Sequence, residues 1–174
     1  VYNEIYSGCK AATLGEIIHN PTVVNDLKEH GVRVISSPDE ALEGERVVIR
    51  SHGAGADVYR RLEELGIGYS DGTCPFVRRI QKIAEDCSQK GMTVVIMGDS
   101  SHPEVIVPDD KALSGFLKKI FENPQKKVAI MPQTTYNISM WQKCREEASL
   151  YEGAVLFDTI CSATEKRQKE AELL

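Results

Sequence analysis

Several cysteines and histidines stand where an apolar, strand-like run gives way to a turn or to the start of a helix. These positions are His19, His52, Cys74, His102 and Cys161. In open α/β sheets, ligands collect beyond the carboxyl ends of the strands, where the backbone N–H groups of helix starts also point. We therefore expect these five side chains to face one central cavity.

Cys74 and Cys161 share a local pattern that favours chemistry. Each follows an Asp-containing turn, DGTC or DTIC, and precedes a predicted helix. A thiolate at the start of a helix is stabilised by the helix dipole and by nearby N–H groups, which makes it a good ligand or nucleophile. Cysteine is also tolerated at tight strand-to-helix turns because it is small, and position alone does not separate these two readings.

The other cysteines carry no such motif. Cys87 and Cys144 follow apolar residues at helical spacing, so both are predicted to lie in the core, whereas Cys9 is predicted to be an exposed loop residue. Five cysteines are an odd number. This usage fits a reducing compartment, the cytoplasm, better than a disulfide scaffold.

The histidines at strand-to-turn junctions suggest an anion site. His19, His52 and His102 occupy equivalent junctions, and imidazoles that converge on one cavity suit a phosphate or a diphosphate. Metal ligation is the competing use, but the spacings match no HExxH or zinc-finger pattern. His30 stands beside Gly31 at a predicted helix end, where a capping role suffices.

Glu104 and Thr134 are the remaining candidates. Glu104 follows His102 by two residues, and near a thiolate and a bound anion its pKa would rise, which would suit a proton donor. Thr134 and its neighbour Thr135 follow a predicted strand and offer hydroxyls to the same crevice. Capping of the next helix is an equally good explanation for these threonines.

Strands and helices alternate along the chain, which predicts the α/β class with mostly parallel sheets. The predicted strands are residues 10–14, 32–36, 47–50, 67–70, 93–97, 128–131 and 154–157. The predicted helices are residues 21–29, 58–65, 75–90, 111–123, 138–150 and 163–174.

The composition narrows the function classes. The 174 residues contain no apolar run long enough to cross a bilayer, so we expect no membrane partner. A formal net charge of −5 argues against a general nucleic-acid or anionic-membrane surface. A local anion pocket remains compatible with this charge.

Six separated blocks carry chemically unusual residues in a fixed order. They read IIHNPTVV, RSHG, DGTCPFV, HPEV, QTT and DTICSATEKRQ. Together they closely resemble the LytB family of 4-hydroxy-3-methylbut-2-enyl diphosphate reductases, the terminal enzymes of the methylerythritol phosphate route to isoprenoids. The resemblance runs over nearly the whole chain.

The resemblance implies pseudo-symmetric α/β lobes around a central cavity. The expected divisions are a first lobe at 1–74, a second lobe at 75–158 and the start of a third lobe at 159–174, with the rest of the third lobe absent from this chain. The family's first cluster cysteine has no match here, and Cys9 is not its equivalent. We therefore expect the natural protein to be longer than the printed chain.

The resemblance also implies a cofactor and roles for the candidate residues. Three cysteines of the family hold a [4Fe–4S] cluster with one open iron, and Cys74 and Cys161 match two of them. The histidines that match His19, His52 and His102 hold the substrate diphosphate.

The allylic hydroxyl of the substrate then approaches the open iron, which acts as a Lewis acid. By the same resemblance, Glu104 would help to deliver protons, and Thr134 would lie near the substrate hydroxyl. Two electrons enter through the cluster from a donor such as ferredoxin or flavodoxin. The oxygen leaves as water, and the products are isopentenyl and dimethylallyl diphosphates.

Two other classes compete with this reading. A non-catalytic anion-binding α/β module would keep the fold and the histidine pocket without a competent cluster, and the missing first cysteine favours it. A zinc-dependent hydrolase would use cysteine and histidine ligands, although the order of the motifs argues against it.

Overall fold

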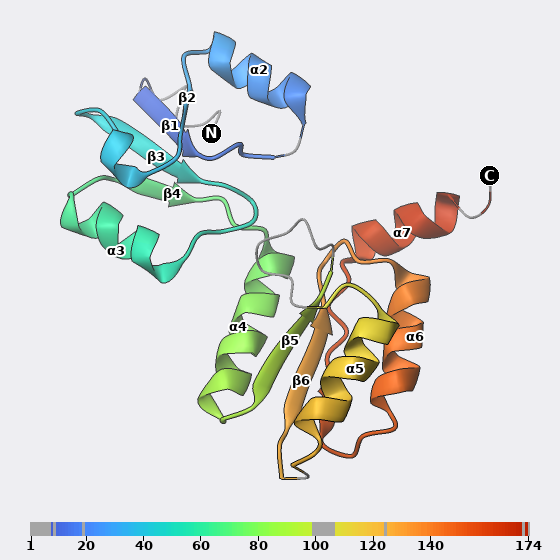
Figure 1. Cartoon of the computed structure of the whole chain (residues 1–174). Coiled ribbons are helices and arrows are strands. Elements are labelled where there is room, and N and C mark those ends of the chain that lie inside the picture. Colours follow the sequence, from blue (N-terminus) through green and yellow to red (C-terminus); the bar gives the residue numbers. More distant parts are fainter. Residues whose placement is uncertain are drawn as a thin grey trace. The chain divides into compact units, whose positions relative to one another are not determined.

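The computed structural model describes residues 8, 10–18, 20–98, 107–123, 125–171 and 173. The chain forms two compact units, Val1–Val77 and Arg78–Leu174, each built on its own sheet (Figure 1). All strand pairs between the named strands are parallel. The α/β class with parallel sheets is therefore confirmed.

The first unit is a four-stranded sheet with the strand order β2-β1-β3-β4. Its strands are β1 (Lys10–Leu14), β2 (Arg33–Ile35), β3 (Glu45–Ile49) and β4 (Tyr69–Asp71). Its helices are α2 (Pro21–Glu29), α3 (Ala56–Glu64) and the short 3₁₀ helix η1 (Pro38–Glu40). Leu14 pairs with Ile49, and Ile49 pairs with Asp71, so the carboxyl ends of β1, β3 and β4 lie in line.

Both faces of the first sheet are covered. Alternate residues of a strand point to opposite faces. One face packs against α3 through Leu62, in a cluster with Ala12, Leu14, Val47 and Ile49. On the other face, Thr13 lies with Val24 and Leu27 of α2 around a small hollow. The central strands are consequently buried on both sides, as their apolar sequences require.

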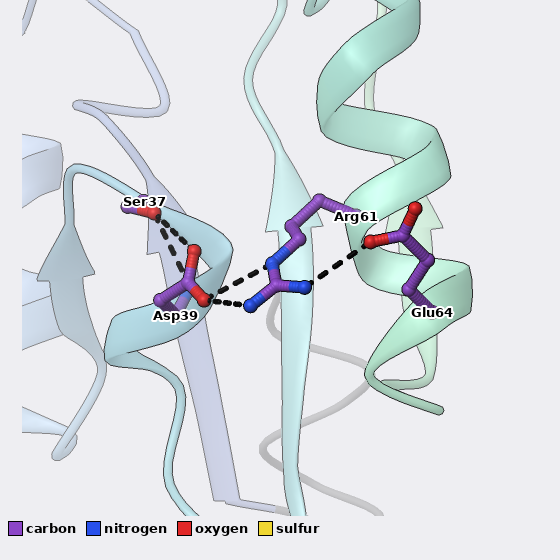
Figure 2. Close-up of polar contacts among 4 residues, drawn as sticks. All are labelled: Ser37, Asp39, Arg61 and Glu64. Atoms are coloured by element: carbon purple, nitrogen blue, oxygen red, sulfur yellow. Dashed lines mark hydrogen bonds and ion pairs between the residues drawn. The ribbon is translucent and has the colours of Figure 1, made fainter.

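An ion-pair network joins η1 to α3 (Figure 2). Arg61 donates from Nε to the Asp39 carboxylate over 3.0 Å, and from Nη1 to the Glu64 carboxylate over 3.1 Å. The Ser37 hydroxyl donates to the other carboxylate oxygen of Asp39 over 3.0 Å. The hydrogen bond from Arg61, followed by the one from Ser37, lowers the pKa of Asp39.

The second unit is a three-stranded sheet with the strand order β5-β6-β7. Its strands are β5 (Thr93–Met97), β6 (Val128–Pro132) and β7 (Ala154–Leu156). The helices are α4 (Pro75–Gln89), which begins in the first unit, α5 (Asp110–Ile120), α6 (Ile138–Ala148) and α7 (Ser162–Ala171).

The central strand of this sheet, β6, is buried along its whole length. Val128 and Ile130 face a cluster with Leu113 and Leu117 of α5 and with Trp141 and Cys144 of α6. Ala129 and Met131 face a second cluster, with Ile80 and Cys87 of α4. The helices therefore cover both faces, and the predicted burial of Cys87 and Cys144 is confirmed.

Helix 21–29 and strand 93–97 match their predictions residue for residue, whereas η1 was not predicted. His30 forms the predicted cap of α2, because its N–H donates to the carbonyl of Asp26. The three-lobe division stays a prediction. Within the described residues, no helix has the length and apolar character needed to span a membrane.

Candidate functional site

The turn after β7 places Cys161 directly before the first residue of α7. Two hydrogen bonds tie this turn to β6 and to the loop behind it. The hydroxyl of Thr159, a buried residue, donates to the carbonyl oxygen of Pro132. The N–H of Cys161 donates to the carbonyl oxygen of Thr134 over 3.0 Å. The position of Cys161 is therefore set by the strand next to it.

The sulfur of Cys161 is half-buried and hydrogen-bonded. It lies 3.1 Å from the hydroxyl oxygen of Thr164, and the N–H of Thr164 donates to it over 3.3 Å. Burial is the largest influence and acts to raise the pKa of Cys161. The hydrogen bonds from Thr164 and from the N–H of Ala163, with the charge of Arg167, outweigh burial and lower that pKa. This environment favours a thiolate, the form that binds metals.

Cys144 in the same unit shows the opposite environment. Its side chain is fully buried in the core, and burial raises the pKa of its thiol. A buried thiol of this kind behaves as a small apolar residue. Cys144 is thus the core residue that the sequence predicted, whereas the role of Cys161 stays a prediction.

Thr134 lies in the loop between β6 and α6. Its carbonyl accepts the hydrogen bond from Cys161, and its side chain is half-buried. Asn137 caps α6, because its side-chain oxygen accepts a hydrogen bond from the N–H of Met140 over 2.8 Å. Helix capping by Thr134 or Thr135, the alternative left open by the sequence, is therefore wrong.

The turn after β4 places Cys74 directly before Pro75, the first residue of α4. Asp71 closes the turn by accepting hydrogen bonds from the N–H and the hydroxyl of Thr73. The N–H of Gly72 donates to the carbonyl oxygen of Ile49 over 2.9 Å. The N–H of Cys74 donates to the carbonyl oxygen of Ser51 over 2.9 Å. Cys74 is half-buried.

We call the turn that carries Cys74, together with the loop after β3 that it bonds to, the Cys74 corner. The turn that carries Cys161 and the loop after β6 are the Cys161 corner. His52 lies in the Cys74 corner. It is half-buried and follows Ser51, whose carbonyl accepts the hydrogen bond from Cys74. The next residue, Gly53, is buried and has a φ of 80°, which a side chain at that position would disfavour. The structure therefore places one predicted phosphate-binding histidine and one predicted cluster cysteine on adjacent loops.

The two corners repeat one backbone plan. Cys74 donates its N–H to the residue two beyond the end of β3, and Cys161 donates to the residue two beyond the end of β6. The strands compared are β1, β3 and β4 in the first unit and β5, β6 and β7 in the second. A glycine follows the first strand of each unit, Gly15 after β1 and Gly98 after β5. Arg50, which follows β3, lies against Gly15, and Gln133, which follows β6, lies against Gly98.

His19, His102 and Glu104 lie outside the described residues, as does Cys9. In the part of the chain that the structure describes, no three His, Cys, Asp or Glu side chains form a group that could hold a metal ion. Cys74 belongs to the first unit and Cys161 to the second, and each is described within its own unit. The roles of all seven predicted site residues stay predictions.

Two residues of this site were not singled out from the sequence. Thr164 is the third residue of α7, a position from which a side chain folds back onto the residue before the helix. That spacing was a usable signal. Gln168, one turn further along α7, binds the loop before α6, and nothing local predicts such a contact. Its side-chain N–H donates to the carbonyl of Tyr136 over 3.0 Å, and its oxygen accepts from the N–H of Ile138 over 2.9 Å.

The family model described as LytB protein matches residues 1–174. A 4-hydroxy-3-methylbut-2-enyl diphosphate reductase of Caldanaerobacter subterraneus subsp. tengcongensis is 44% identical over 171 residues, which cover 93% of this chain and 59% of that protein. The chain therefore spans about three-fifths of the length of this relative.

Two solved structures resemble this chain in fold. The structure of (E)-4-hydroxy-3-methyl-but-2-enyl diphosphate reductase, the terminal enzyme of the non-mevalonate pathway, has a TM-score of 0.74 and 34% identity, and the match covers 99% of this chain and 65% of that one. The E-1-hydroxy-2-methyl-but-2-enyl-4-diphosphate reductase from Plasmodium falciparum has a TM-score of 0.83 at 18% identity, over 95% of this chain and 55% of that one. The second likeness concerns the fold alone.

Proposed function

Because the chain belongs to the LytB protein family, we propose that it takes part in the reductive removal of the allylic hydroxyl of (E)-4-hydroxy-3-methylbut-2-enyl diphosphate. The products are isopentenyl and dimethylallyl diphosphates, and the reaction is the last step of the methylerythritol phosphate route. The observation that carries this proposal is the repeated corner, in which Cys74 and Cys161 each stand before a helix with their N–H bound to the neighbouring loop.

The donor chemistry of the two corners fits a [4Fe–4S] cluster. Iron–sulfur clusters are held by cysteine thiolates, and Cys161 has a half-buried sulfur whose hydrogen bonds favour the thiolate. Cys74 and Cys161 would hold the cluster with a third cysteine that the family resemblance implies. When bound, the cluster supplies electrons and an open iron that acts as a Lewis acid.

The substrate diphosphate is bound by imidazoles. His52, on the loop next to the Cys74 corner, donates a hydrogen bond to a phosphate oxygen, and His19 and His102 act in the same way. A buried hydrogen bond to a charged group is worth about 1.5–3 kcal/mol. Three such contacts orient the substrate and counter its negative charge.

Proton delivery and the orientation of the substrate hydroxyl are assigned to Glu104 and Thr134. Glu104 is the proton donor, and Thr134 orients the substrate hydroxyl from the loop that also accepts the hydrogen bond of Cys161. With Asn137 capping α6, the Thr134 hydroxyl is not used at the helix start. The electrons come from a small redox protein such as ferredoxin or flavodoxin, and the location is the cytoplasm.

Anaerobic quantification of iron and acid-labile sulfide tests the proposal. The complete natural protein is expected to contain both and to show broad visible absorption. Cys74→Ser and Cys161→Ser should each remove most of the cluster, because a hydroxyl is a poor iron ligand. Cys87→Ala is the matched control, since it changes a cysteine of α4 that is buried in the core and should leave the iron content unchanged.

The other outcomes identify the competing classes. Wild-type protein without iron or sulfide that still binds a diphosphate would indicate an anion-binding module. Zinc without iron would indicate the hydrolase. Glu104→Gln with full activity would remove that residue from the proton path.

A further inference from the structure

The two cysteine corners differ in what surrounds the sulfur. The residue three beyond Cys161 is Thr164, whose hydroxyl and N–H both lie within hydrogen-bond distance of the sulfur. The residue three beyond Cys74 is Val77, which has no hydroxyl. Among the described residues, the sulfur of Cys74 makes no hydrogen bond. The two cysteines are therefore not equivalent as ligands.

The direction of the bond to Thr164 follows from the state of the sulfur. A free thiol could donate or accept, whereas a cysteine bound to iron has no proton and can only accept. Thr164 is 8% exposed, so little water competes for its hydroxyl. In such a setting of low polarity, a hydrogen bond to a charged atom is stronger than in water.

Hydrogen bonds to cluster sulfurs are one of the factors that set the reduction potential of an iron–sulfur cluster. A donor that points at a cysteine sulfur stabilises negative charge. Since the reduced cluster carries one more negative charge than the oxidised cluster, the donor stabilises the reduced state more. The result is a higher reduction potential.

We propose that Thr164 is a positioning and tuning residue, whose hydroxyl hydrogen-bonds the sulfur of Cys161 and raises the reduction potential of the cluster that this cysteine holds. The inference rests on the proposed function, because it requires the cluster. It adds a residue that acts on the cofactor through its ligand and does not touch the substrate. It also assigns different electronic roles to the two corners.

A redox titration of the cluster, followed by electron paramagnetic resonance, tests the inference. Thr164→Val keeps the size of the side chain and removes the hydroxyl, whereas Thr164→Ser keeps the hydroxyl. At a fixed applied potential near the midpoint, the ratio of reduced to oxidised cluster should fall about tenfold in Thr164→Val, a shift of about 59 mV for one electron. Thr164→Ser should stay close to wild type.

The reciprocal change is made in the other corner. Val77→Thr places a hydroxyl three residues beyond Cys74, the position that Thr164 holds relative to Cys161. The ratio of reduced to oxidised cluster should rise. If Thr164→Val fails to retain its cluster, Val77→Thr decides alone: a higher potential supports the inference, and an unchanged potential overturns it.

The failure of the inference is distinct from that of the proposed function. If the wild-type protein contains neither iron nor sulfide, it has no cluster, and the proposed function is overturned. A wild-type cluster whose potential is the same in Thr164→Val leaves the function standing and overturns the role of Thr164. Equal potentials in Thr164→Ser and Thr164→Val, both below wild type, would also overturn it, because packing would then be the cause.

Discussion

The Cys74 corner and the Cys161 corner have the same backbone arrangement but different side chains around the cysteine. In both, the cysteine N–H donates to the loop after the neighbouring strand, β3 or β6. The strands β1, β3 and β4 end in line, as do β5 and β6, whereas β7 ends opposite Ile130, two residues before the end of β6. The Cys74 corner is closed by Asp71 and by a close approach at Gly72. The Cys161 corner is closed by the side chains of Thr159, Thr164 and Gln168.

This difference shows that the position of the cysteine sulfur and its chemical properties depend on different parts of the corner. Both units use the same parallel-strand arrangement and the same backbone hydrogen bond from the cysteine N–H to the loop after the neighbouring strand. Setting the chemistry of that sulfur requires side chains, which are free to differ. We therefore expect changes to the backbone of a corner to cost more stability than changes to its side chains.

The largest effect is expected from a change to the backbone of the Cys74 corner. A Cβ added at Gly72 would lie 2.6 Å from the carbonyl oxygen of Ile49, the atom that also accepts the N–H of Gly72. Gly72→Ala must move one of the two loops, at a cost of about 2–3 kcal/mol. Urea unfolding of the purified protein measures this loss.

A glycine in open space provides the control. Gly115 lies within α5, and a Cβ added there meets no atom within 4 Å. Gly115→Ala should stabilise the protein by about 0.5–1 kcal/mol, because alanine favours the helix and restricts the unfolded chain. A Gly72→Ala variant as stable as wild type would show that the corner has room for a side chain.

A smaller effect is expected from the side chains of the Cys161 corner. Gln168→Leu removes the hydrogen bonds that join α7 to Tyr136 in the loop before α6 and to Ile138 at the start of α6. The N–H of Ile138 and the carbonyl of Tyr136 then lose this partner. The expected cost is about 1–2 kcal/mol. Gln142→Leu is the control on α6, since its side chain is exposed and, among the described residues, bonds only to the nearby Glu146. Equal unfolding midpoints for the two variants would contradict the role of Gln168.

Local patterns explain which parts of the fold the sequence predicted. Strand 93–97 is a continuous apolar run with a glycine on each side of it, and helix 21–29 begins with a capping asparagine and proline. The 3₁₀ helix η1 has three residues, which is too short for a periodic pattern. β3 begins at Glu45, two residues before the predicted start, because Arg33 and the N–H of Leu42 satisfy the buried carboxylate.

The same distinction between local and distant partners applies to the site. The bond from Thr164 to Cys161 spans three residues, so it could be inferred from the sequence. The partners of Gln168 lie 30 and 32 residues away, and only the folded unit brings them together. Cys74 and Cys161 could be singled out as candidate site residues because a turn followed by a helix start is a local feature of the sequence. The family resemblance supplied their proposed role as cluster ligands.

The smallest effect is expected away from both corners, in the network of Asp39 and Arg61 (Figure 2). Since the folded protein lowers the pKa of Asp39, its contribution to stability is present above the unfolded pKa of about 3.9 and is lost as the pH falls through the lower folded value. Both side chains are exposed, so solvent screens the pair and the contribution is small.

A double-mutant cycle with Asp39→Asn and Arg61→Met measures this coupling. The coupling should be detectable at neutral pH, decrease at high salt and disappear once Asp39 is protonated. A coupling as large as the loss in Gly72→Ala would mean that η1 and α3 stabilise the first unit as strongly as its corner does.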